Sequence, residues 1–230
     1  MSKENQTSHH EDNFEHIEEA LTSTEQFIEK HQKQLSIFAV AIIVVIAGFM
    51  GYHKFYSVPL EKEAIEQAAG AQLYFSKDAF KEALNGDGNK LGFIEIMNEY
   101  GSTSIGNTAK AYAGVCCLKL GQFDDAIKYL KGFSSDDLII SQMAIANLGD
   151  AYMEKGDFAA AADNYEKAAA DKANNFTTAI YLMKAGTAHE LNKDYDKAIT
   201  AYERIKSEFS KSMEARDIEK YITRAKLLKK

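Results

Sequence analysis

The side chains best suited to chemistry in this chain include two adjacent cysteines, Cys116 and Cys117. Neighbouring residues on a helix point about 100° apart, so this pair cannot close an unstrained disulfide. The pair also lacks the two-residue spacer that is usual in redox and metal-binding cysteine motifs. We therefore expect two buried thiols that act as small apolar side chains, and they leave the redox compartment of the protein open.

The six histidines do not form a recognisable metal site or catalytic motif. Three lie in the N-terminal tail, two flank an apolar stretch, and one takes the place of a packing residue in a repeated segment. The chain has no HExxH, CxxC, phosphate-binding loop or GxSxG motif, and its adjacent acids do not form a converging pair. We expect no enzymatic activity, cofactor, metal or small-molecule substrate. In the order given, the histidines are His9, His10 and His16, then His31 and His53, then His189.

A turn-rich segment at residues 85–89, NGDGN, is weakly similar to a calcium-binding loop. Lys90 stands where such a loop needs its glycine, and Ile96 where it needs a bidentate glutamate. The segment is therefore interpreted as a turn between two helices.

The most hydrophobic stretch, residues 35–52, reads LSIFAVAIIVVIAGFMGY and holds no charge. As a helix with a rise of about 1.5 Å per residue it covers about 27 Å, close to the hydrocarbon thickness of a bilayer. It is apolar on all sides, whereas a buried core helix usually keeps a polar stripe. Mostly acidic residues precede it, unlike the basic start of a cleaved signal peptide. The sequence predicts an uncleaved membrane span with Tyr52, Phe55 and Tyr56 at the interface.

The composition favours an all-helical protein that does not bind nucleic acid. The 230 residues include one proline and no tryptophan, and Ala, Glu and Lys are abundant. Residues 1–34 carry a net charge of −5 and the remainder −2. Neither part has the basic surface that nucleic-acid binding needs. The residues after the span are enough for one domain with its own core.

Pro59 marks the predicted boundary between the span and this domain. Proline disfavours a helical conformation at the preceding residue, Val58, and suits the first turn of a new helix. We therefore expect a break at Ser57–Val58. Outside the repeats described next, the expected helices cover residues 59–75, a short segment ending at 84, residues 90–99 and residues 212–228.

From about residue 107 the chain contains three copies of one sequence pattern, whose starts are 35 and 37 residues apart. Residues 142–175 align with 179–212, and the first copy begins near Asn107. In each copy, a small residue on one helix recurs with an aromatic after a turn, an alanine and a large residue on a second helix. These positions are Gly114, Phe123, Ala126 and Leu130 in the first copy, Gly149, Phe158, Ala161 and Tyr165 in the second, and Gly186, Tyr195, Ala198 and Tyr202 in the third.

This pattern resembles the tetratricopeptide repeat, a helix–turn–helix unit of about 34 residues. The small residues would let the two helices of a unit approach closely, and the large ones would bury against the next unit. The family's frequent late proline is absent (Ala173, Ser210). Because no unit covers its apolar face alone, helices on either side are expected to cap the stack.

The resemblance implies a protein-binding groove lined by the first helix of each unit. Methionines and small residues rimmed by charge would suit the helices or unfolded segments of other proteins. Burial of some of these side chains by neighbouring helices is the alternative. The groove positions are Thr108, Ala111, Val115, Leu118 and Lys119; Met143, Ala146, Asp150, Met153 and Glu154; and Ile180, Met183, Thr187, Glu190 and Leu191.

The whole layout is similar to the YfgM-type family of bacterial envelope proteins, in its Bacteroides-like lineage. That resemblance implies a single-pass inner-membrane protein with a cytoplasmic N-terminus. Its periplasmic repeats would link the Sec translocon with periplasmic chaperones or emerging chains. A cytoplasm-facing receptor or scaffold is one alternative, because lysines near the span are balanced on its two sides. A purely structural oligomer, with the span or groove as its self-association surface, is the other. The predicted parts are an acidic tail (1–34), the span with an interfacial extension (35–56), capping helices (57–106), three repeats (107–211) and a capping helix (212–230).

Overall fold

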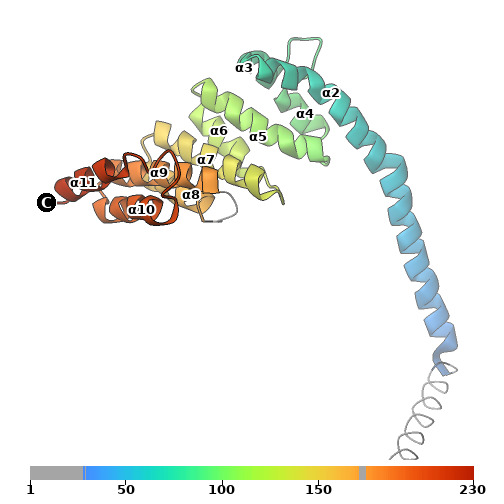
Figure 1. Cartoon of the computed structure of the whole chain (residues 1–230). Coiled ribbons are helices and arrows are strands. Elements are labelled where there is room, and N and C mark those ends of the chain that lie inside the picture. The colour runs from blue at the N-terminus through green and yellow to red at the C-terminus, as the bar shows by residue number, and fades with distance from the viewer. Residues whose placement is uncertain (1–27, 29, 171–174) are drawn as a thin grey trace, which may run out of the picture. The chain divides into compact units, whose positions relative to one another are not determined.

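The computed structural model describes residues 28, 30–170 and 175–230, and within them the chain forms helices and turns without a strand (Figure 1). Contacts divide the chain into two units, Met1–Val58 and Pro59–Lys230, which are described separately below. The expectations for the N-terminal tail, including those for His9, His10 and His16, lie outside the described residues.

The first unit contains the start of a helix that runs from Lys30 to Ser76. Its most apolar 18-residue window has a mean hydropathy of 2.5 and is not buried within the structure. Val45 and Phe49, for example, are each 70% exposed. Among the described residues, this is the one helix that is long and apolar enough to cross a membrane.

The expected break at Ser57–Val58 is replaced by a π-helical turn, η1 (His53–Ser57). Val58 has helical torsion angles, φ −66° and ψ −46°, and its N–H donates to the carbonyl of His53. This five-residue spacing widens the helix by one residue at the point where Pro59 has no N–H to donate. The prediction of a break was therefore wrong, because the helix continues through Pro59 with a π-helical hydrogen bond just before it.

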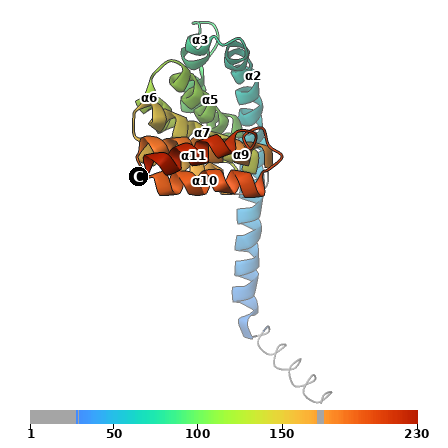
Figure 2. The ribbon, with the colours of Figure 1, turned by 60° about the vertical axis from the view of Figure 1, so that its left-hand side comes forward.

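The second unit is a succession of antiparallel helices in which each packs on its neighbours in the chain from α5 onward (Figures 1 and 2). Helices α2 to α4 and α5 share one core cluster, with α2 contributing three buried alanines. The helices are α2 (Val58–Ser76), α3 (Phe80–Asn85), α4 (Phe93–Glu99), α5 (Ser104–Lys119), α6 (Phe123–Lys131), α7 (Leu138–Glu154), α8 (Phe158–Ala168), α9 (Asn175–Leu191), α10 (Tyr195–Glu208) and α11 (Ile218–Leu228).

Four of these helices begin at a residue whose side chain accepts a hydrogen bond from a backbone N–H three residues later. Such a cap satisfies one of the N–H groups that a helix start leaves without an intrahelical partner. The pairs are Thr103 with Gly106 for α5, Asp137 with Ile140 for α7, Asp157 with Ala160 for α8, and Asp194 with Lys197 for α10.

The turn inside each helix pair contains one residue with a positive φ. In the first two pairs this residue is glycine, Gly121 (φ 75°) and Gly156 (φ 77°). In the third pair it is Lys193 (φ 62°). The left-handed conformation reverses the chain tightly, so that α5 and α6, α7 and α8, and α9 and α10 form three helix hairpins.

The closest helix approaches occur inside these hairpins. A Cβ added to Gly149 on α7 would lie 2.7 Å from the ring of Tyr165 on α8, and one added to Gly186 would lie 2.3 Å from Tyr202 on α10. As predicted, these large residues also pack against the next unit: Tyr165 shares a core cluster with Ala185 and Ala188 of α9, and the Tyr202 ring lies 5.6 Å from that of Tyr221 on α11. Each ring fills the space left by the glycine of its own unit, because the hairpin brings the two positions face to face.

The stack ends at α11, which starts at Ile218 rather than near Ser212 as predicted. Residues 209–217 form turns, and Ser212 Oγ there accepts a hydrogen bond from the backbone N–H of Ala215. Phe209 in this segment is 7% exposed and anchors it to the core shared by α9, α10 and α11.

Candidate functional site

A cleft of about 450 Å³ opens between the first two hairpins. It brings together residues from the ends of α5 and α7 with residues of α6 and α8. Five of the predicted groove residues line it: Leu118, Lys119, Asp150, Met153 and Glu154. The sequence-based prediction missed Gly121, Phe123 and Tyr165, which complete the lining.

Tyr165 and Asp150 form the hydrogen-bonded floor of the cleft. The Tyr165 hydroxyl donates to Asp150 Oδ1 at 2.6 Å, and the Lys184 ammonium on α9 donates to both carboxylate oxygens, at 2.7 and 2.9 Å. Lys184 Nζ also lies 5.5 Å from the centre of the Tyr165 ring. A cation over an aromatic face and a charge-assisted hydrogen bond support the same arrangement. These three residues therefore tie α7, α8 and α9 together beneath the cleft.

Burial raises the pKa of Tyr165 above its usual value, and the hydrogen bond to Asp150 raises it further. The ring is 2% exposed, so ionisation would place a second negative charge beside Asp150 in a poorly solvated site. The Tyr165 hydroxyl consequently remains a hydrogen-bond donor at neutral pH. The floor is a fixed polar network rather than a group poised to transfer a proton.

The walls of the cleft combine apolar surface with charges that remain accessible. Leu118, Phe123 and Met153 are each partly buried, so part of each side chain faces solvent. Lys119 and Glu154 are exposed on opposite hairpins. A lining of this kind can hold an apolar side chain and orient a polar neighbour, which is the arrangement common in peptide-binding surfaces.

The other predicted groove residues do not line the cleft. Met143 is 51% exposed near the start of α7, whereas Ala146 is 4% exposed and belongs to the core between α7 and α9. Glu190 is occupied by Arg224 of α11, at 2.9 Å, and its side chain is only 10% exposed. Those that remain are Thr108, Ala111, Val115, Ile180, Met183 and Thr187, all partly buried, and Leu191, 49% exposed.

Neither the cysteines nor His189 contributes an accessible reactive group. Burial raises the pKa of Cys116 to about 12 and that of Cys117 to about 11, so both stay as thiols at neutral pH. His189 is 2% exposed and its Nε2 lies 2.7 Å from Glu166 Oε1, which makes it a packing residue between α8 and α9. Within the described residues, no three His, Cys, Asp or Glu side chains gather to hold a metal ion.

Helix hairpins of one design, stacked in sequence with a cleft between them, define a helical-repeat protein. The family model of the tetratricopeptide repeat matches residues 146–212. The match runs from α7 through α10 and supports a tetratricopeptide-repeat protein, a class whose repeats act as protein–protein interaction modules. No curated protein matches the chain at a significant level.

Proposed function

We propose that this protein is a membrane-anchored adaptor that holds a segment of another protein in the cleft between α5–α6 and α7–α8. The observation that carries the proposal is the convergence of five predicted groove residues with Phe123 and Tyr165 around one opening. The apolar helix Lys30–Ser76 supplies the anchor through its residues 35–52, which would lie in the lipid bilayer.

The chemistry of the cleft favours a peptide segment with an apolar side chain next to polar or charged ones. Met153 is flexible and polarisable, so it can adapt to different apolar side chains. Lys119 and Glu154, one on each side, would pair with opposite charges or backbone groups of the bound segment. The fixed Tyr165–Asp150–Lys184 floor keeps the opening in shape without an ordering cost on binding.

Met153→Glu tests this site in the full chain. Met153 is partly buried at the cleft and not in the fully buried core, so the variant should keep its helical content and melting temperature while capture of partners by chemical crosslinking falls at least about tenfold. Met213→Glu is the matched control, because Met213 is 67% exposed in the turn segment before α11. Equal capture by both variants would remove the cleft as the binding site.

We further propose that the repeats face the periplasm of a bacterial cell and bind translocon subunits, chaperones or emerging chains there. The resemblance to YfgM-type proteins supports this placement. A cytoplasm-facing receptor with the same anchor is the second candidate, because the lysines around the span, Lys30 and Lys33 before it and Lys54 and Lys62 after it, select neither orientation.

A reporter fused after Lys230 separates the two orientations. Activity only in the periplasm supports the first proposal, and activity only in the cytoplasm supports the second. The orientation does not affect the test of the cleft, because the two variants are compared by crosslinking in the same intact membranes. A self-assembling structural protein remains as a third candidate, and it predicts that crosslinking recovers only further copies of the chain.

A further inference from the structure

Helix α11 covers the end of the stack with an apolar stripe that faces α10. Ile218, Ile222 and Ala225, at spacings of four and three residues, are 2%, 4% and 0% exposed. Their partners in the shared core include Tyr202, Ile205 and Phe209. On its other side α11 is open to solvent, where Leu227 and Leu228 are 62% and 51% exposed.

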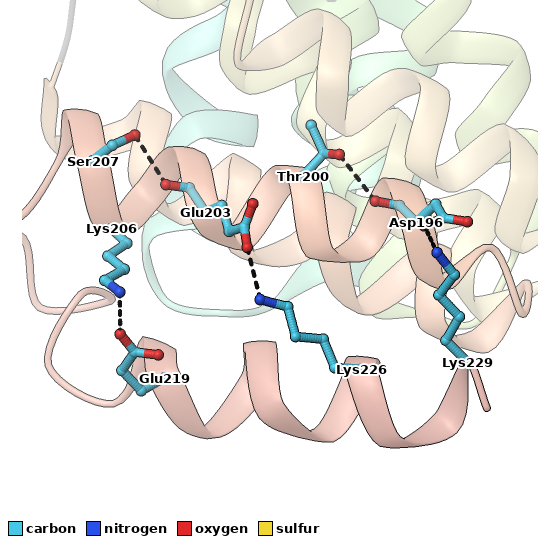
Figure 3. A network of polar contacts seen from close by, with 8 residues as sticks. All are labelled: Asp196, Thr200, Glu203, Lys206, Ser207, Glu219, Lys226 and Lys229. Carbon is cyan, nitrogen blue, oxygen red and sulfur yellow. Dashed lines mark hydrogen bonds and ion pairs between the residues drawn. The ribbon is translucent and has the colours of Figure 1, made fainter.

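Beside this stripe, three ion pairs connect α11 to one edge of α10 (Figure 3). Lys226 Nζ lies 3.0 Å from Glu203, Lys229 Nζ lies 2.5 Å from Asp196, and Lys206 pairs with Glu219. Every side chain in these pairs is more than half exposed. Pairs of this kind are screened by salt, so they guide the position of a helix more than they fasten it.

The arrangement of charges matches the direction of α11. The acceptors Asp196 and Glu203 stand two turns apart on α10, and Lys229 and Lys226 meet them in reverse order, so the two helices run antiparallel. Thr200 Oγ1 and Ser207 Oγ donate to backbone carbonyls of α10 itself, at Asp196 and Glu203, which leaves both carboxylates to the neighbouring helix.

Helix α9 adds one further acidic contact on the opposite flank of α11. Arg224 binds Glu190 through two nitrogens, with Nε 2.9 Å from Oε2 and one terminal nitrogen 3.1 Å from Oε1. Three acidic residues therefore border the apolar surface beneath α11: Asp196 and Glu203 on one side and Glu190 on the other. The surface selects a helix that carries aliphatic residues on one face, cations on both flanks and an acid near its start, opposite Lys206.

We propose that this surface of α9 and α10 is a second docking surface, on which a basic amphipathic helix of another protein replaces α11. The contacts made by α11 indicate the chemistry of that partner: aliphatic side chains at i, i+4 and i+7, flanked by lysine or arginine, with an acidic residue at i+1 opposite Lys206. The inference is independent of the cleft between the first two hairpins. Helix α11 acts as a tethered competitor, whose high effective concentration keeps the surface covered until a partner helix is present.

Charge reversal on α11 tests the proposal in the full chain in detergent micelles. In Lys226→Glu/Lys229→Glu the new carboxylates face Glu203 and Asp196, so α11 should be repelled while the surface beneath it stays intact. A labelled peptide with the sequence of residues 217–230 should then bind at least about tenfold more tightly than it binds the unmodified chain. Its affinity should fall as salt is raised, because the pairs are exposed.

Two controls separate specific docking from a general loss of structure. Lys220→Glu changes the charge of an exposed α11 residue that has no ion pair among the residues placed by the structure, and it should bind the peptide as weakly as the unmodified chain does. In Asp196→Lys/Glu203→Lys the surface becomes basic. That variant should not bind the native peptide of residues 217–230. It should bind the reversed peptide, which is the same segment with Lys226→Glu and Lys229→Glu.

Amide hydrogen exchange reports where α11 lies in each variant. Exchange in residues 218–228 should accelerate in Lys226→Glu/Lys229→Glu, while exchange in α7 stays unchanged. Unchanged protection of α11, or equal binding of native and reversed peptides by both reversed chains, would overturn the proposal. So would a doubling of the particle mass, because it would mean that α11 of a second copy, and not a partner helix, takes the surface.

Discussion

At the scale of single residues, Gly149 and Tyr165 set how closely two helices approach. The ideal Cβ position at Gly149 lies 2.7 Å from a ring carbon of Tyr165, which is 2% exposed and held by its hydrogen bond to Asp150. Gly149→Leu should therefore lower the free energy of unfolding by about 1–3 kcal/mol or more. Gly132→Leu is the control, since its nearest neighbour would be 3.4 Å away. Equal melting temperatures for the two variants would contradict this packing.

Tyr165 also links stability to alkaline pH. Its pKa is raised in the folded state by burial and by Asp150, and burial raises the pKa of Tyr202 to about 12. In the unfolded chain a tyrosine loses its proton near pH 10. Because the pKa of both tyrosines is higher in the folded state, each contributes its full stabilisation of the fold below pH 10 and loses it as the pH rises towards the folded pKa. The melting temperature should fall between pH 8 and about pH 11.

Tyr165→Phe checks the contribution of this residue. Removing the hydroxyl should lower the free energy of unfolding by about 1 kcal/mol at pH 8, since one buried hydrogen bond is lost. The variant should then lose less stability than the unmodified chain on going to alkaline pH. Thermal unfolding at both pH values measures the difference, and parallel losses in the two proteins would rule out Tyr165 as a source of it.

At the scale of elements, the three hairpins use the same left-handed turn with different residues. Lys193 takes a positive φ at the position where the other hairpins have Gly121 and Gly156. A non-glycine residue in this conformation costs about 1 kcal/mol. Lys193→Gly should therefore raise the free energy of unfolding by about 0.5–1 kcal/mol, despite the greater freedom of glycine in the unfolded chain.

Gly156→Lys is the reciprocal change and should lower stability by a similar amount. A Cβ at Gly156 meets no atom within 4 Å, so backbone conformation alone would cause the loss. Chemical denaturation of the two variants provides the comparison. If both changes shifted the midpoint in the same direction, the equivalence of these turns would be lost.

The repeat spacing in the sequence predicts these elements well, because small and large residues recur at hairpin distances. Alignment of the three copies identifies Gly149 as a small position and Tyr165 as a large one, but it does not predict which helix each residue packs against. The π-helical turn before Pro59 was not predictable, because several backbone geometries accommodate the missing N–H. Three of the eight cleft residues were missed because the groove positions were taken only from first helices, whereas Phe123 and Tyr165 lie on second helices and Gly121 lies in a turn.

At the scale of the whole molecule, the open cleft lies between the first two hairpins, whereas α11 covers the third hairpin. Glu190, predicted as a groove residue, is paired with Arg224, and a partner would have to displace that contact. The second hairpin, by contrast, leaves Met153 and Glu154 open beside Lys119. The repeats therefore have an open cleft between the first two hairpins and a surface on the third hairpin that α11 covers.

The central claim is that the cleft binds another polypeptide while the chain is held in a membrane. A photo-crosslinking amino acid placed at Met153, in intact membranes, tests it most directly, with the same amino acid at Met213 as the comparison. We predict a discrete crosslinked partner, identified by mass spectrometry, from position 153 and not from position 213. The absence of any crosslinked polypeptide at 153, or the same products from both positions, would contradict the account.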